Sequence, residues 1–475
     1  MNNWLGKLGK EEALLVDDDA SNQILTTRVV ALRDCANLYE ESEYRLSYMM
    51  TSMMNSSNNY YYDNDDALTW VSGVMTNHKT CLDGLKEKGY VGVDDDEVLQ
   101  SGNLTMLLDE ALDLYAKRKG KAKAKAKGAP QRQRAFSRSS PSNNGGILAS
   151  WNPSTHKAEF IVSQDGSGTH RTIRDAVEAI AASRGSSSHE ERTIVYVKAG
   201  VYHEKVVIGS KLQNVMFVGD GMDRTIVTGS RSVVDGSTTV GSATFDVYGD
   251  GFWARDMTFE NTAGSIKHQA VALKSSSDLS VFYRCRFRAY QDTLFVHSNR
   301  QFYRDCQILG TIDFIFGDAT VVIQNSDIYV RKPMLSQSNY VTAQGRDDPR
   351  KPTGISIINC RIRPANDLGS SGGSIKTFLG RPWKRYSRTV VMKSDLDGLI
   401  NPRGWGEWDG EFAIRTLYYG EYMNYGNGAN VRNRVNWPGF HVLSSANEAY
   451  AFSVSEFLQG GRWIPASGVP FSSGI

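Results

Sequence analysis

Two periodicities of hydrophobic residues divide the chain into an N-terminal part and a longer C-terminal part. In the first 115 residues, apolar side chains recur every three or four positions, which is typical of amphipathic helices. Beyond residue 150 they alternate with polar residues in short runs bounded by Gly, Asn, Asp or Ser, which is typical of β-strands. A chain of 475 residues is too long for one average core, so we expect two domains.

The N-terminal pattern predicts three helices in a small antiparallel bundle. Their apolar stripes are Leu25, Val29, Leu32, Ala36 and Tyr39; Ala67, Trp70, Val74, His78 and Cys81; and Leu104, Leu107, Leu108, Ala111, Leu112 and Tyr115. A shorter segment near Leu5–Leu15 is a candidate fourth helix. Cys35 and Cys81 lie on two of the predicted helices and could cross-link them, which would require an oxidising compartment.

A repeat of about 21 residues runs through the C-terminal part, where Cys285 and Cys306 mark two similar segments. Fainter copies lie at 254–259, 323–328 and 357–362, and the longer intervals between copies must contain loops. A fixed period of this kind indicates a solenoid, and short strands without intervening helices favour a right-handed parallel β-helix. The cysteines fall on inward positions, where we expect small buried thiols, although Cys285 and Cys306 could also pair.

Asp292 and Asp313 are also 21 residues apart, and their surroundings differ. Asp292 has polar neighbours, whereas Asp313 precedes an apolar run. Since residues one period apart stack at about 4.8 Å per coil, we expect both on one outer face, with Gln269 one coil earlier. Unlike surroundings push two carboxylate pKa values apart, which can make an acid and a nucleophile from one residue type. One such residue alone would more often be a local turn former.

Charge is distributed unevenly, although the net charge is only +2. Residues 1–115 contain 21 acidic and 8 basic residues, whereas residues 116–150 contain 10 basic residues and no acidic one. The segment 116–150 is also rich in Gly, Pro, Ser and Asn, which predicts an exposed linker. Its basic run could bind nucleic acid or an acidic polymer, but a solvated tether is the simpler interpretation.

Five motifs follow one another in the C-terminal part. They are Gly200-Val201-Tyr202-His203-Glu204, Gln269-Ala270-Val271-Ala272-Leu273, Tyr290-Gln291-Asp292-Thr293-Leu294, Asp313-Phe314-Ile315-Phe316-Gly317 and Leu379-Gly380-Arg381-Pro382-Trp383. In this order and spacing, they resemble those of plant pectin methylesterases over roughly residues 158–475. The resemblance implies a carboxylic ester hydrolase that removes methyl esters from galacturonate units of pectin, releases methanol and modifies the cell wall.

The helical part is similar to the pectinesterase-inhibitor-like pro-region of the same family, because Asp34-Cys35 and Thr80–Gly84 fit the second cysteine pair of that region. The first pair is missing, and Met1–Lys10 has no apolar signal-peptide core. We therefore expect an N-terminally incomplete chain of an extracellular, cell-wall protein. The expected domains are the pro-region at 1–115, the linker at 116–150 and the β-helix enzyme at 151–475.

The resemblance also implies a role for each residue of the site. Asp313 is the nucleophile, and Asp292 is the general acid for methanol and then the base for water. Gln269 and Gln291 donate hydrogen bonds to the tetrahedral oxyanion, a role that suits carboxamide groups because they donate without titrating.

Arg381, Trp383 and Thr239 complete the implied substrate-binding set together with Gln269. Arg381 pairs with Asp313, and we expect it to lower the pKa of Asp313, while the nearby negative charge raises that of Asp292. Trp383 packs against the sugar, and Thr239 falls at a substrate-contacting position. Tyr290, Phe314 and Trp405, like Trp383, would be core or edge packing in most proteins, but an aromatic floor under a sugar ring also suits them.

Three positions depart from the family pattern. Asp318 stands where the family usually has Asn, Val240 where an aromatic residue is common, and 131–136 where a different basic processing site is usual. Asp318 bears on the pH dependence of the activity, Val240 on the contacts with the substrate, and the segment 131–136 on the position of cleavage. The acidic bundle and the basic linker also predict that the pro-region docks on the enzyme domain and lowers its activity until cleavage near Arg132–Arg134.

Two other functions fit parts of the sequence. A pectate lyase or polygalacturonase shares the β-helix, but it needs a calcium-binding acidic cluster with a basic residue or three clustered carboxylates, and we find neither pattern. A regulator that inhibits other pectinesterases would not require the five intact motifs. We expect a monomer that binds methylated homogalacturonan and is a candidate partner of pectinesterase inhibitors. We expect no cofactor or metal, and no nucleic acid or membrane as a partner.

Overall fold

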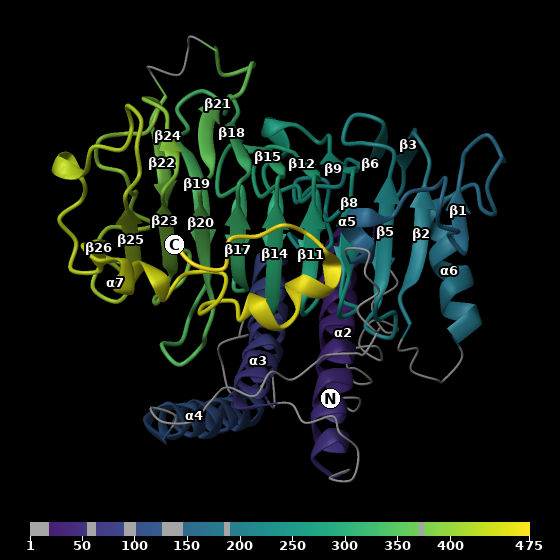
Figure 1. Ribbon diagram of the computed structural model, residues 1–475, viewed down its shortest axis with the longest axis horizontal. Helices are drawn as coiled ribbons and strands as arrows, with labels where there is room; N and C mark the ends of the chain where they lie inside the picture. Colours follow the sequence, from purple (N-terminus) through teal and green to yellow (C-terminus); the bar gives the residue numbers. More distant parts are fainter. Residues whose placement is uncertain (1–18, 55–62, 90–100, 126–145, 185–190, 370–374) are drawn as a thin grey trace. The chain divides into compact units, whose positions relative to one another are not determined.

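The computed structural model describes residues 19–54, 63–89, 101–125, 146–184, 191–369 and 375–475 (Figure 1). The chain forms two compact units. The first unit contains Met1–Gln131, Arg231–Ser242 and Arg350–Pro352, and the second contains Arg132–Ser230, Ala243–Pro349 and Thr353–Ile475. Within the described ranges, no helix has both the length and the hydrophobicity that a membrane span requires.

The first unit contains the three predicted helices. They are α2 (Asp19–Met54), α3 (Asn64–Glu87) and α4 (Ser101–Lys125), so α4 includes the start of the segment 116–150. Helix α3 contacts both α2 and α4, and a disulfide between Cys35 and Cys81 joins α2 to α3, which is the cross-link that the sequence left open. The candidate helix near Leu5–Leu15 lies outside the described residues, as does the candidate cleavage segment 131–136.

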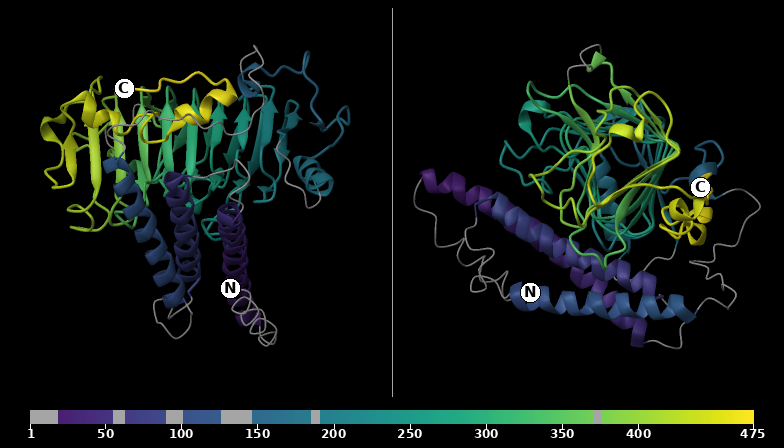
Figure 2. Two further views of the ribbon diagram at one scale, coloured as in Figure 1. Left: turned by 60° about the horizontal axis from the view of Figure 1, so that its bottom comes forward. Right: turned by 90° about the vertical axis from the view of Figure 1, so that its left-hand side faces the viewer.

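The second unit is built from three sheets whose strands are all parallel, which confirms the predicted β-helix (Figures 1 and 2). The 11-stranded sheet contains β1 (Phe160–Val162), β2 (Thr193–Val197), β5 (Val215–Gly219), β8 (Trp253–Arg255), β11 (Ser280–Tyr283), β14 (Arg300–Arg304), β17 (Thr320–Gln324), β20 (Gly354–Ile358), β23 (Arg388–Met392), β25 (Tyr418–Tyr422) and β26 (Phe440–Val442). The 8-stranded sheet contains β3 (Gly200–His203), β6 (Thr225–Gly229), β9 (Thr258–Asn261), β12 (Arg286–Arg288), β15 (Gln307–Gly310), β18 (Asp327–Val330), β21 (Arg361–Pro364) and β24 (Asp395–Leu396). The 7-stranded sheet contains β4 (Val206–Ile208), β7 (Phe245–Val247), β10 (Leu273–Ser275), β13 (Leu294–Val296), β16 (Ile315–Gly317), β19 (Asn339–Gln344) and β22 (Thr377–Gly380).

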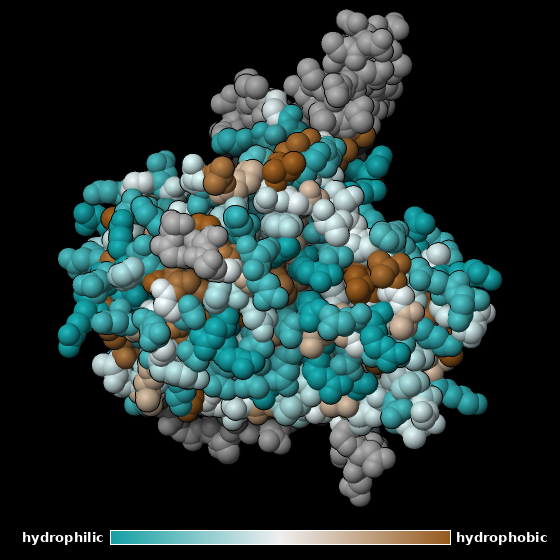
Figure 3. Space-filling model, turned by 90° about the horizontal axis from the view of Figure 1, so that it is seen from above, coloured by the Kyte–Doolittle hydropathy of each residue, from teal (hydrophilic) through white to brown (hydrophobic). Residues whose placement is uncertain are grey.

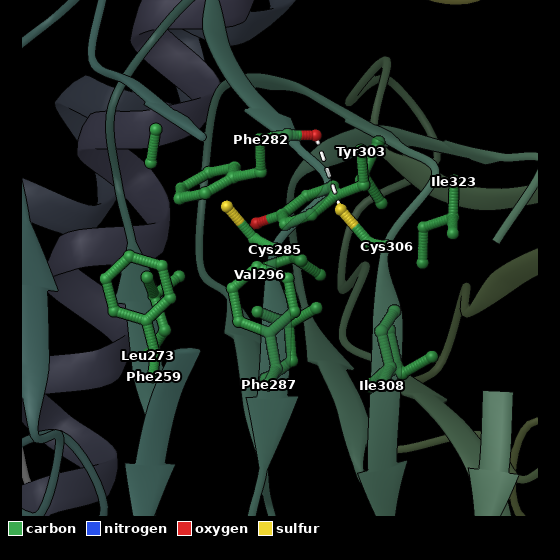
Figure 4. Packing of buried hydrophobic residues seen from close by; sticks show 14 of the residues in the cluster. Phe259, Leu273, Phe282, Cys285, Phe287, Val296, Tyr303, Cys306, Ile308 and Ile323 are labelled. Atoms are coloured by element: carbon green, nitrogen blue, oxygen red, sulfur yellow. Dashed lines mark hydrogen bonds between the residues drawn. The ribbon is translucent and has the colours of Figure 1, made fainter. Parts of the chain in front are cut away.

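Like residues stack along the interior of the β-helix. Strand β11 pairs with β14 so that Phe282 lies opposite Tyr303, and the two rings stack at 4.7 Å between centroids. Figure 4 shows this part of the core, in which the thiol of Cys306 donates a hydrogen bond to the carbonyl oxygen of Phe282. Cys285, Cys306 and Cys360 are free and buried, so the thiol interpretation is confirmed and a Cys285–Cys306 disulfide is wrong.

The outer face of the 11-stranded sheet is covered by the two ends of the second unit. The C-terminal segment, with α7 (Ala446–Tyr450), η5 (Gly460–Arg462) and η6 (Ile464–Ser467), crosses this face in Figures 1 and 2. Its apolar side chains, such as Leu458 and Ile464, form one buried cluster with outward residues of the sheet. The short helix α5 (Ile147–Ser150) joins the same cluster, while α6 (Ile173–Arg184) contacts β1 and β4.

Ion pairs between neighbouring coils mark the 8-stranded sheet. Arg288 pairs with Glu260, Arg361 with Asp327, and Arg363 with Asp395. The strands of this sheet are labelled along the top of Figure 1, and the view from that side in Figure 3 is mainly hydrophilic. The 7-stranded sheet differs, because it carries the candidate active site.

Candidate active site

Asp292 and Asp313 have the same unusual backbone conformation on consecutive coils. Both are left-handed, with φ of 63° and 52°, and they lie just before β13 and β16. The amide of Asp292 donates to the carbonyl oxygen of Ile312 at 3.0 Å, so the two turns are hydrogen-bonded to each other. Aspartate enters this region more readily than most residues because its short polar side chain can hydrogen-bond locally.

The two candidate oxyanion donors lie beside these turns. Gln269 and Gln291 form a parallel bridge, which places Gln269 one coil before Asp292 and two coils before Asp313. Both side chains are half-buried. Within the described part of the chain, neither carboxamide has a hydrogen-bond partner, so their N–H groups are available to a bound ligand.

Arg381 holds both oxygens of Asp313. Its Nε donates to one carboxylate oxygen at 2.8 Å and its Nη2 donates to the other at 2.6 Å. Arg381 directly follows β22, whose register with β19 brings it to the coils that carry Asp313. A bidentate pair fixes the orientation of the carboxylate as well as its position.

Burial, and not Arg381, decides the direction of the pKa shift of Asp313. Removal of the carboxylate from water raises its pKa, and the hydrogen bonds and charge of Arg381 lower it by less, so the pKa is raised overall. Arg381 thus lowers the pKa of Asp313 as expected, but the expectation of a pKa that is lowered overall is wrong, because Asp313 is only 5% exposed and burial outweighs Arg381. Burial also lowers the pKa of Arg381, but Asp313, Tyr340 and Asp292 raise it overall.

Two aromatic rings contact the guanidinium of Arg381. Its central carbon lies 4.3 Å from the ring centroid of Tyr340 and 4.4 Å from that of Trp408. Tyr340 is itself stacked on Phe378 at 5.3 Å. The sequence motifs did not identify Tyr340 or Trp408, since neither lies in a motif, and only contact with Arg381 distinguishes them from ordinary aromatic residues.

The other aromatic candidates divide into two groups. Trp383 is half-buried and contacts the stacked pair Phe295–Phe316, so a sugar ring could reach it. Tyr290 is also half-buried, and its hydroxyl accepts a hydrogen bond from Arg331. Phe314 and Trp405 are fully buried, so core packing is confirmed for these two residues and they do not form a sugar-binding floor.

Thr239, Val240 and Asp318, which the sequence also singles out, lie in different parts of the structure. Thr239 and Val240 lie in the segment Arg231–Ser242, which belongs to the first unit, so the role of Thr239 stays a prediction. Asp318 is buried and accepts a hydrogen bond of 2.5 Å from the hydroxyl of Thr353. In the described residues, no group of three or more His, Cys, Asp or Glu side chains is arranged to hold a metal ion.

Known proteins resemble this chain along most of its length. The profile of the pectinesterase family matches residues 159–461, and that of the plant invertase/pectin methylesterase inhibitor family matches residues 9–114. A probable pectinesterase/pectinesterase inhibitor of Arabidopsis thaliana is 54% identical over 94% of this chain and 87% of its own length. A pectinesterase of Citrus sinensis is 47% identical over 94% of this chain and 82% of its own length.

Solved structures resemble the second unit. A pectin methylesterase from carrot is 52% identical, with a TM-score of 0.66, and the match covers 68% of this chain and 99% of that protein. A pectin methylesterase from Aspergillus niger is 30% identical, with a TM-score of 0.55, and the match covers 64% of this chain and 95% of that protein.

Proposed function

This chain belongs to the pectinesterase family and carries a region of the plant pectin methylesterase inhibitor family, and from this premise we propose that it uses Asp313 as a covalent nucleophile. The enzyme removes methyl esters from the galacturonate units of pectin and releases methanol. The observation that supports the assignment of Asp313 is its bidentate pairing with Arg381 one coil after Asp292.

In the first half of the proposed reaction, a carboxylate oxygen of Asp313 attacks the carbonyl carbon of the methyl ester. Each oxygen keeps a lone pair for this attack, although both accept a hydrogen bond from Arg381. The carbonyl oxygen becomes an oxyanion that accepts hydrogen bonds from Gln269 and Gln291. The carbon–methoxy bond then breaks, Asp292 gives its proton to the departing methoxide, and Asp313 is left joined to the sugar acyl group as an anhydride.

In the second half, the carboxylate of Asp292 takes a proton from water as the water oxygen attacks the acyl carbon. The bond to Asp313 breaks, which restores the Asp313 carboxylate and releases the galacturonic acid unit, and this unit loses the second proton of the water to the solvent. Asp292 keeps the proton it took, so the site returns to its starting state. Trp383 is a proposed substrate-binding residue of the second unit, and Thr239 is proposed as a substrate-binding residue from the sequence alone.

Membership of the family supports a proposal for the setting of this activity. We place the enzyme in the extracellular cell wall as a monomer, with methylated homogalacturonan as its substrate and pectinesterase inhibitor proteins as candidate partners. We keep 1–115, 116–150 and 151–475 as the proposed domains.

The assignment of the nucleophile is tested by replacing Asp313 with Asn. Methanol release from highly methylated pectin should fall by several orders of magnitude, because an amide cannot form the acyl-enzyme. A matched control is Asp327→Asn, because Asp327 has an equivalent two-bond pair with Arg361 on a different sheet. Asp327→Asn should keep most of the activity, whereas an Asp313→Asn variant within tenfold of the wild type would exclude the covalent mechanism.

A further inference from the structure

The guanidinium of Arg381 has one anionic neighbour and two aromatic neighbours. Its Nε and Nη2 bind Asp313, and its central carbon lies over the rings of Tyr340 and Trp408. The side chain is only 21% exposed, so water reaches little of the positive charge. An aromatic ring face attracts a cation, and the attraction grows when the cation is removed from water.

Tyr340 and Trp408 have different structural surroundings. Tyr340 belongs to β19 and stacks on Phe378, so it also packs as part of the sheet. Trp408 is 38% exposed and lies outside every strand of the three sheets. Its neighbour in sequence, Trp405, is fully buried and donates its indole N–H to Glu421, which is an ordinary structural role. The ring contact described for Trp408 is with Arg381.

The proposed reaction changes the charge next to Arg381. While Asp313 carries the acyl group, its carboxylate charge is gone, and the negative charge lies on Asp292, which has given up its proton and also acts on Arg381. Arg381 then has no bidentate partner, and the contacts with the two rings persist through this step. They also stop the guanidinium from turning away, so it is in place when the Asp313 carboxylate is released.

We propose that Trp408 is a positioning residue that clamps Arg381 against Tyr340 and stabilises its charge during the acyl-enzyme stage. This inference rests on the proposed nucleophile Asp313. It differs from a sugar-stacking role for Trp408, in which the exposed part of the ring would bind substrate and affect mainly KM.

The first test separates kcat from KM. Trp408→Leu should lower kcat about tenfold or more with KM within about twofold, and Trp408→Phe should recover most of the loss because a ring face is retained. Tyr425→Leu is the control, since Tyr425 is a more exposed aromatic (55%) that continues the 8-stranded sheet beyond β24. A higher KM with unchanged kcat, or equal effects of Trp408→Leu and Tyr425→Leu, would overturn the proposal.

The second test uses chemical rescue. If Trp408 had a purely structural role, its replacement would not change the guanidinium concentration that rescue requires. In Arg381→Ala, millimolar guanidinium should restore part of kcat by binding between the two rings. Adding Trp408→Leu should raise the concentration for half-maximal rescue about tenfold or more, whereas Tyr425→Leu should leave it unchanged. Rescue that is equally effective without Trp408, or no rescue of a folded Arg381→Ala enzyme, would contradict the clamp. Activity of Asp313→Asn would instead contradict the nucleophile on which the clamp depends.

Discussion

Arg381 binds Asp313 through two hydrogen bonds of 2.8 and 2.6 Å, although 68 positions separate the two residues in the sequence. The β-helix makes this contact possible because strand β22 follows β16 and β19 in the 7-stranded sheet. The carboxylate is thus oriented before a substrate binds.

The acid side of the pH profile should depend on Arg381. The pKa of Asp313 is raised by burial and partly lowered by Arg381, and the proposed nucleophile must be ionised. Activity should therefore fall as the pH falls through this raised pKa. Arg381→Gln removes the lowering contribution, so the pKa should rise further and the acid limb of kcat/KM should move to higher pH. A limb that stays in place or moves to lower pH would show that another group controls it.

Loss of either oxyanion donor should reduce kcat. Gln269→Ala and Gln291→Ala should each lower kcat by about 10²–10³ if the carboxamides act mainly in the transition state. Gln307→Ala is a suitable control, because Gln307 is a half-buried residue on the 8-stranded sheet. If either active-site change raised KM alone, that glutamine would be a substrate-binding group and not an oxyanion donor.

A small substitution should displace Trp383. A Cβ at Gly345 would lie 2.7 Å from Cε3 of the Trp383 ring, closer than such atoms approach in proteins, so Gly345→Ala must push the ring aside. We expect KM for pectin to rise several-fold with a smaller change in kcat, because the atoms nearest to the added Cβ belong to Trp383 and Gly317 and not to Asp313 or Arg381. Gly461→Ala, with nothing within 4 Å of its Cβ, is the matched control. An unchanged KM would remove Trp383 from the substrate-binding set.

Periodicity was sufficient to predict the parts of the site that repeat. Asp292, Asp313, Gln269 and Gln291 follow one another coil by coil, so a 21-residue spacing brings them together. Trp408 has no counterpart in that repeat, and its contact with Arg381 depends on the path of a loop, which local sequence does not specify. The pKa direction of Asp313 was mispredicted for a similar reason, since burial depends on everything packed around the carboxylate.

The helical region should reduce the activity of the enzyme to which it is joined. Residues 1–115 are strongly acidic and match the inhibitor family, and a linker keeps them at an effective concentration of about millimolar, so even weak docking would matter. Cutting the chain within 126–145 and removing the released fragment should increase methanol release at fixed pH and salt. The same treatment of a chain that lacks the cleavage site is the control, and equal activity before and after cutting would exclude inhibition in cis.

The disulfide between Cys35 and Cys81 should stabilise the helical unit alone. It closes a loop across 46 positions, for which chain entropy predicts a contribution of about 4 kcal/mol to the free energy of unfolding. Reduction should therefore increase hydrogen exchange in α2 and α3 of the full chain and leave the β-strands protected, because Cys285, Cys306 and Cys360 are already free. Cys35→Ala with Cys81→Ala should reproduce the effect without reductant, and Cys306→Ala should not. Equal loss of protection in the strands would mean that the two units unfold together, whereas unchanged exchange in α2 and α3 would show that packing alone holds the helices.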